Sequence, residues 1–239
     1  MNKLTIDKIN SILDKIMEDL YVRSSLDDYY QFDFYFRVVK LGWIIPVGFD
    51  GYDFFNKPSV EISDDELIKG FVDFFDINID LTFLALISLE KDINPSIYKL
   101  MCECIDAYKS GLYQICIPAL FSITESYLAD LSNDGNLSAT KYKYGLSSKV
   151  KLNHDGEFWG FDVSDDFPEK FAPVCHAIIA FLDKYFCTVD FELFTGLNRH
   201  SFAHGRQNYN ATKEDVVMLM FVITNIISMY YDVEFSEKE

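Results

Sequence analysis

Hydrophobic residues recur every three to four positions along most of the chain, which is the period of an α-helix. Start and stop signals divide this pattern into separate segments. The expected helices cover residues 6–22, 26–40, 64–75, a short stretch within 80–89, then 95–108, 112–131, 168–186, 191–202, and a last helix from 213 onward. The sequence therefore predicts an all-α protein.

Three of these helices have a recognisable first turn. Ser63-Asp-Asp-Glu66 has the spacing of a capping box. Asn94-Pro95 places proline at a first helical position, where its missing N–H costs nothing. Thr212 can cap the last helix, with Asp215 at the third position. Between the second and third helices, the glycine-containing stretch 42–51 breaks the pattern.

Two helical segments are unusually apolar. In 112–131, one stripe contains Leu112, Ile115, Ala119, Ile123, Tyr127 and Leu131, and Pro118 should kink the helix. The run 216–231 has no charged residue, but it is too short for a membrane span. Because it is apolar on nearly every face, we expect it to be a core helix.

The polar stretch 132–167 interrupts this helical pattern. It is too long for a loop that only connects two helices, so it is either a functional insertion or in part a small β-hairpin. The sequence accordingly predicts an N-terminal helical appendage at residues 1–92 and a helical bundle at 93–235 that contains the insertion.

A net charge of −17 argues against a general nucleic-acid binder. Two windows nevertheless contain no acidic residue, 135–154 and 193–213. Together they carry a charge of +7, while the remainder of the chain is strongly acidic. If the windows meet in space, they could attract a polyanion. Their cations are Lys141, Lys143, Lys149, Lys151, Arg199, Arg206 and Lys213. Of these, we expect Lys141, Lys143, Lys149, Lys151 and Arg206 to be RNA-binding residues.

Composition also bears on the compartment. The N-terminal segment lacks the uninterrupted apolar core of a secretory signal. The five cysteines are odd in number, and Cys116 and Cys175 lie in apolar helical segments, as reduced thiols do. We expect a cytoplasmic protein without a membrane anchor.

The segment LNRHSFAHGRQ, residues 197–207, holds two of the four arginines and two of the four histidines. Arg199 and His204 would lie about 140° apart on a continuous helix. Gly205 predicts a helix end, which frees His204 to turn toward Arg199. This pair suits RNA cleavage without a metal. The imidazole can accept the 2′-hydroxyl proton, and the guanidinium can stabilise the charge that builds on phosphorus.

Arg199-His-Ser-Phe-Ala-His204 resembles the R-x4-6-H motif of HEPN domains. The apolar helix with Pro118 and Glu125, and Gly205 before a long apolar helix, are also similar to this family. The resemblance covers residues 93–235. It implies a HEPN-like helical bundle, a homodimer with two facing motifs, and a metal-independent endoribonuclease of phage defence, abortive infection or a toxin–antitoxin system. The alternative is a catalytically silent HEPN-like module that binds a protein or small ligand.

By position, the resemblance makes Arg199 the phosphate-binding cation and His204 the general base. His200 would contact a phosphate or orient Arg199. Arg206 stands where some toxins of the family have a tyrosine modified by a partner nucleotidyltransferase, which argues against that mode of control. The competing interpretation is an arginine and a histidine that merely complement a helix end.

Three further features have two interpretations each. Glu125, the only charged residue between Lys109 and Asp130, either faces Arg199 or His204 inside the bundle or faces solvent. The alternation Lys141-Tyr-Lys-Tyr144 suits stacking on RNA but would look the same in a plain hairpin. His200 and His204 have the spacing of a zinc pair, yet no third ligand is evident, so we expect no metal and no cofactor.

Overall fold

The computed structural model describes residues 29–47, 49, 55, 61–131, 146, 150–152, 161–163, 171–187, 196–205 and 209–236. Within these ranges the protein is built mainly from α-helices, with one small pair of strands. The helix expected at residues 6–22 lies outside the described residues.

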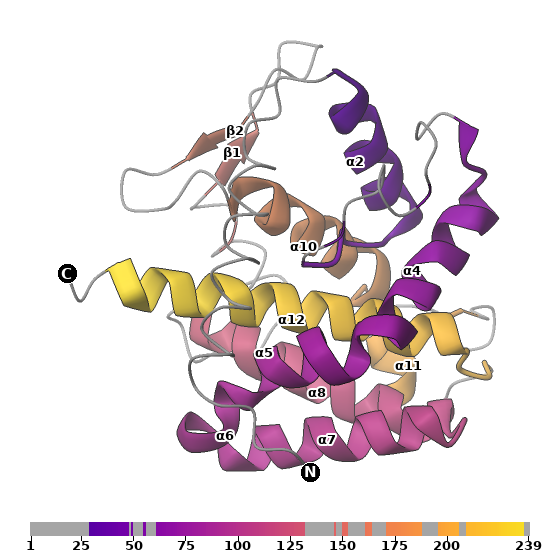
Figure 1. The fold of residues 1–239 in the computed structure, drawn as a ribbon, viewed down its shortest axis with the longest axis vertical. Coiled ribbons are helices and arrows are strands. Elements are labelled where there is room, and N and C mark those ends of the chain that lie inside the picture. The colour runs from indigo at the N-terminus through magenta and orange to yellow at the C-terminus, as the bar shows by residue number, and fades with distance from the viewer. Residues whose placement is uncertain are drawn as a thin grey trace.

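The centre of the fold is α12 (Lys213–Ser236), which crosses the middle of the molecule in Figure 1 with α7 and α8 on one side and α2 and α10 on the other. Every residue from Val216 to Met229 is buried, which confirms the predicted core helix. The predicted cap is also present, because Thr212 N–H donates to the Asp215 carboxylate at 2.8 Å and Thr212 Oγ1 accepts from Asp215 N–H at 3.4 Å.

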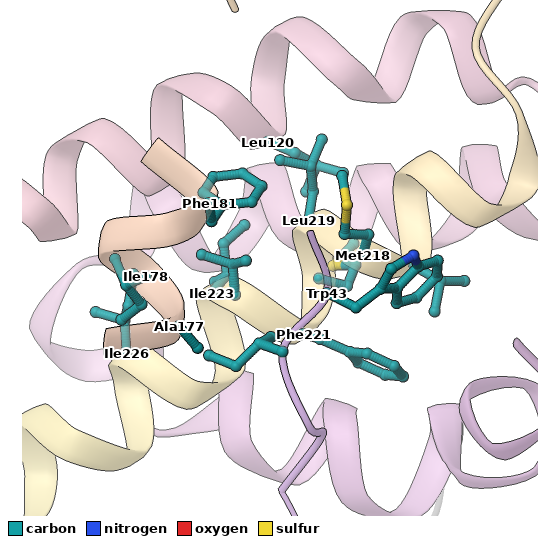
Figure 2. Close-up of a cluster of buried hydrophobic side chains, with 14 of the residues drawn as sticks. Trp43, Leu120, Ala177, Ile178, Phe181, Met218, Leu219, Phe221, Ile223 and Ile226 are labelled. Atoms are coloured by element: carbon teal, nitrogen blue, oxygen red, sulfur yellow. The ribbon is translucent and has the colours of Figure 1, made fainter. Parts of the chain in front are cut away.

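Side chains from several elements meet on α12, as Figure 2 shows. Trp43, from the segment after α2 (Tyr29–Leu41), packs against Phe221 with ring centroids 6.2 Å apart. On other faces of α12 lie Leu120 of α8 and Phe181 of α10. Residues 35–87 and 101–229 contribute to this single core, so the described part of the expected appendage is built into the bundle.

The region from α4 to α6 covers one side of α12. The predicted capping box opens α4 (Asp64–Asn78), since Ser63 and Glu66 each accept from the other's backbone N–H. The helix continues past the expected end and passes into a π-helical turn, η2 (Ile79–Phe83). Two short helices follow, α5 (Leu84–Ser88) and α6 (Glu90–Ile93).

Two long helices form a hairpin beneath α12. Asn94 caps α7 (Pro95–Lys109) by accepting from Ile97 N–H, with Pro95 at the first position as predicted. Gly111, at φ +74°, reverses the chain before α8 (Tyr113–Leu131). The predicted stripe on α8 is wrong at its beginning. Leu112 and Ile115 are 54% and 63% exposed, because α8 turns a different face to the core. That core face comprises Cys116, Ile117, Leu120, Phe121, Ile123, Thr124, Tyr127 and Leu128.

On the far side of α12, α2 packs against α10 (Ala172–Tyr185). Tyr35 of α2 donates its hydroxyl to Pro173 O at 2.7 Å and lies 2.8 Å from His176 Nδ1. Since the hydroxyl proton goes to the carbonyl, His176 Nδ1 is the donor in the second contact. Gly42 ends α2 at φ +84°, and a side chain there would collide with Lys184 and Tyr185.

The stretch 132–167 contains two antiparallel strands, β1 (Val150–Leu152) and β2 (Phe161–Val163), which correspond to the hairpin alternative. Both strands lie against α10. In the part of the chain that the structure describes, no helix combines the length and the apolarity that crossing a bilayer requires.

Candidate active site

The candidate site is built on a five-residue helix, α11 (Arg199–Ala203), which lies beside α8. Sequence periodicity predicted a longer helix from residue 191. Instead, residues 196–198 are not helical, because Asn198 has an extended backbone at φ −157° and ψ 129°. The helix therefore begins at Arg199, which places the guanidinium at its first turn.

Asn198 determines where this helix starts. Its side chain is fully buried, and its Oδ1 accepts from Ser201 N–H at 3.1 Å, which is an N-cap. Its Nδ2 donates to Cys187 O at 3.0 Å and so ties the helix to the end of α10. The helical pattern of the sequence did not reveal this residue. The available signal was an asparagine directly before a short polar helix, a preferred N-cap.

Aromatic packing fixes the face of α11 that turns inward. Phe202 is buried and approaches Phe121 of α8, with ring centroids 6.4 Å apart. Phe121 in turn meets Phe186 edge-on at 5.4 Å. Because Ser201 and Phe202 occupy the buried face, the neighbouring Arg199 lies at the border between α11 and α8.

Arg199 is paired with Glu125, as one of the two interpretations of that acid expected. Arg199 Nη2 donates to Glu125 Oε2 at 2.8 Å, and the two side chains are 33% and 19% exposed. A guanidinium has five N–H donors in a rigid plane, so one contact fixes its orientation and leaves donors for a second acceptor. The Arg199 guanidinium therefore has a fixed orientation and remains partly exposed to solvent.

His200 and His204 lie together at the end of α11. Their ring centroids are 4.4 Å apart at an angle of 74°. The helix ends where Gly205 predicts, since Gly205 adopts φ +61° and its N–H donates to Phe202 O at 3.1 Å. His204 is exposed and His200 half-buried, so an imidazole is accessible beside the arginine's helix.

The pKa of His200 is lowered from its ordinary value. Partial burial is the main cause, and the electrostatic influence of the neighbouring His204 and Arg199 lowers the pKa further. Because all three act against the imidazolium form, His200 is neutral at pH 7 and can accept a proton or a hydrogen bond. Arg199 and His204 are thus close enough to His200 to affect its pKa.

Two cations of the acid-free window 193–213, Arg199 and Lys213, lie next to acidic side chains from other parts of the chain. Arg199 meets Glu125 of α8, and Lys213 lies 2.5 Å from Asp76 of α4. Helix packing brings these carboxylates in from elsewhere in the chain, which the window's composition could not reveal. Arg199 and Lys213 are therefore each paired with a carboxylate from another segment.

Most of the expected RNA-binding residues lie outside the described part of the chain. Lys141, Lys143, Lys149 and Arg206 lie outside the described residues. Lys151 belongs to β1, where it stands opposite Asp162 of β2. The meeting of the two windows stays a prediction.

The structure also contains a polar cleft that the sequence did not suggest. Its volume is about 360 Å³, and it lies where α4, η2, α7, α8 and α12 converge. Two ion pairs line it, Lys109–Asp80 at 2.7 Å and Lys213–Asp76, and Tyr108 also donates to Asp76 at 2.6 Å. Since each lysine already faces a carboxylate, this arrangement serves to join the helices.

Across the described ranges, no three His, Cys, Asp or Glu side chains gather in a way that could hold a metal ion. Comparison with protein-family models, with curated proteins and with solved structures finds no match.

Proposed function

We propose that the protein is a metal-independent endoribonuclease whose catalytic residues are Arg199 and His204. The observation that carries this proposal is the guanidinium held by Glu125 at the start of a helix that ends in a histidine pair. The resemblance of Arg199–His204 to the R-x4-6-H motif supplies the reaction class.

In the proposed reaction, His204 accepts the proton of a ribose 2′-hydroxyl, and the 2′ oxygen attacks the adjacent phosphorus. The bond from phosphorus to the 5′ oxygen then breaks, and this oxygen leaves as a hydroxyl that carries the proton which His204 had accepted. The products are a 2′,3′-cyclic phosphate and a 5′-hydroxyl. General-base help of this kind contributes about 10²- to 10⁴-fold to the rate.

Arg199 binds the phosphate and stabilises the charge that develops on its oxygens. Glu125 is a positioning residue, because it accepts from one Nη group at 2.8 Å. The other N–H donors of the guanidinium are those that bind the phosphate in this proposal. His200, neutral at pH 7, hydrogen-bonds the phosphate or keeps the His204 ring in place. RNA is the substrate class, and the setting is phage defence, abortive infection or a toxin–antitoxin system.

A silent helical module that binds a protein or small ligand is the second candidate. Two observations favour it: the net charge of −17, and the carboxylate partners of Arg199 and Lys213. Both lower the affinity of this surface for a polyanion.

The test is incubation of end-labelled RNA with the purified protein in chelator, beside His204→Ala and Arg199→Ala. Arg37→Ala is the matched control, because Arg37 also pairs with a carboxylate, Asp64 at 2.6 Å, but on α2. The proposal expects cyclic-phosphate ends from the wild type and the control and none from the two site variants. Intact RNA with every folded protein would support the silent module instead.

A further inference from the structure

Two cysteines face each other across the hairpin of α7 and α8, which lie side by side in Figure 1. Cys104 is on the buried face of α7 and Cys116 is on the core face of α8, with exposed fractions of 4% and 1%. Cys116 Sγ lies 3.5 Å from Cys104 O, and the two thiols are hydrogen-bonded to each other. All five cysteines of the chain are free thiols, so this contact is a reduced pair.

The turn between the two helices fixes this contact. Gly111 adopts a left-handed conformation, and Leu112 N–H donates to Ala107 O at 2.9 Å, which closes the end of α7. The chain therefore reverses within a few residues, and α8 returns beside α7. Cys104 and Cys116 stand within about two helical turns of this reversal, on facing sides of the hairpin. Their contact is thus a property of the hairpin itself.

The contact makes the two thiols chemically unequal. The hydrogen bond between them lowers the pKa of Cys116, whereas the same bond and burial raise the pKa of Cys104. The thiolate is the nucleophilic form of a cysteine. Cys116 is therefore the member of the pair that reacts first, and Cys104 is the member that attacks the product.

The beginning of α8 offers a small oxidant a route to this pair. Cys116 lies in the first turn, where backbone N–H groups have no partner within the helix. Pro118 lacks an N–H and interrupts the helical hydrogen bonds again one turn later. The neighbouring Ile115 is already 63% exposed. Local opening of this turn exposes Cys116 while the core around α12 stays folded.

We propose that Cys104 and Cys116 are an oxidation site, at which a peroxide converts the two thiols into a disulfide. The Cys116 thiolate attacks one oxygen of hydrogen peroxide, the O–O bond breaks, and a sulfenic acid and hydroxide form. The hydroxide takes up the proton that Cys116 had released and becomes water. The Cys104 sulfur then attacks the Cys116 sulfur, and the sulfenic hydroxyl leaves as water with the Cys104 proton. In total, two thiols lose two electrons to the peroxide, and one disulfide and two waters result.

The test treats the reduced, folded protein with a few equivalents of hydrogen peroxide and alkylates the thiols that remain. Peptide mapping by mass spectrometry without reduction should find Cys104 linked to Cys116, and dithiothreitol should reverse the bond. Cys102→Ser is the matched control, because Cys102 is a half-buried thiol on the same helix, and this variant should form the same disulfide. Cys175, which is buried against the thioether of Met229 at 3.9 Å, should stay a thiol.

Two further variants test the order of the steps. In Cys104→Ser, the reaction should stop at the sulfenic acid of Cys116, which dimedone traps. In Cys116→Ser, Cys104 should remain a thiol. Dimedone labelling of Cys104 in the second variant, without labelling of Cys116 in the first, refutes this order.

Thermal unfolding gives a second readout on the same samples. The disulfide closes the hairpin covalently, so the oxidised wild type should unfold several degrees above the reduced protein. A disulfide that leaves this midpoint unchanged or lowers it shows that the native hairpin does not accommodate the bond, which overturns the proposal. The proposal is also overturned if both Cys104 and Cys116 remain alkylatable after peroxide while Cys187 is oxidised, or if their disulfide forms only in urea.

Discussion

The ion pair between Glu125 and Arg199 should contribute measurably to stability, and the structure limits how much. The guanidinium nitrogen and the carboxylate oxygen are 2.8 Å apart. At this separation and an effective dielectric constant of about 20, the Coulomb attraction is about 6 kcal/mol. Most of this is offset by desolvation, because both groups are more than half removed from water. We expect a net coupling of about 1–2 kcal/mol, above the value for exposed pairs and below that for fully buried ones.

A double-mutant cycle measures this coupling. The four proteins are the wild type, Glu125→Ala, Arg199→Ala and the double variant, and the quantity is the free energy of unfolding in urea. The control cycle uses Lys99 and Glu103 on α7, a pair separated by 3.7 Å with side chains 78% and 59% exposed. Its coupling should be at most about 0.5 kcal/mol. Equal couplings in the two cycles would refute the claim that Arg199 is held in place by Glu125.

Three further perturbations test the surroundings of the site. Asn198→Ala removes a buried cap and should lower the free energy of unfolding in urea by about 1–2 kcal/mol. The same change at exposed Asn210 should have no effect. Gly42→Ala should destabilise the protein more than Gly111→Ala in thermal unfolding, because both have positive φ but only at Gly42 must neighbouring side chains, Lys184 and Tyr185, shift to admit the added Cβ. Burial lowers the pKa of His176, so the folded state binds fewer protons than the unfolded state. Its contribution to stability is present above about pH 6.5 and is lost as the pH falls below that value. His176→Gln should therefore flatten the pH dependence of the unfolding free energy between pH 7 and pH 5, and an unchanged slope would contradict this assignment.

Local signals in the sequence predicted the helix ends well. The capping box at Ser63, the proline after Asn94 and the cap at Thr212 all lie where the structure begins a helix. Gly205 ends α11 for the same reason, since its left-handed conformation suits glycine. These features depend on three or four adjacent residues, so no knowledge of the tertiary structure was needed.

The sequence left two environments open for Glu125, one in solvent and one facing Arg199 or His204. The structure shows the contact with Arg199. An acid within a long apolar helix is costly to bury alone, which favours a cationic partner. The sequence contains few arginines, and one of them begins the candidate motif. Composition therefore narrowed the choice of partner to a small number of residues.

The buried face of α8 could not be predicted in the same way. The helix is apolar on nearly all sides, so periodicity does not distinguish the core face from the exposed face. A stripe that advances four residues at a time also rotates by about 40° per step around the helix. It therefore begins on the exposed side, at Ile115, and reaches the core only at Ile123.

Contacts between distant segments could not be predicted from the sequence either. Lys213 and Asp76 are separated by 137 positions, and only the packing of α4 against α12 brings them together. Asn198 was missed because apolar residues continue upstream of it and imitate a helix that starts earlier. In both cases, the outcome depends on which surfaces the tertiary structure joins.

The most direct test of the account is the initial rate at which wild-type protein and His204→Ala form 2′,3′-cyclic phosphate ends on a labelled RNA in chelator. A general base at His204 predicts that the variant is slower by at least about 100-fold while its unfolding curve stays that of the wild type. Equal rates for the two proteins, or no cyclic-phosphate ends from the folded wild type, would contradict the account.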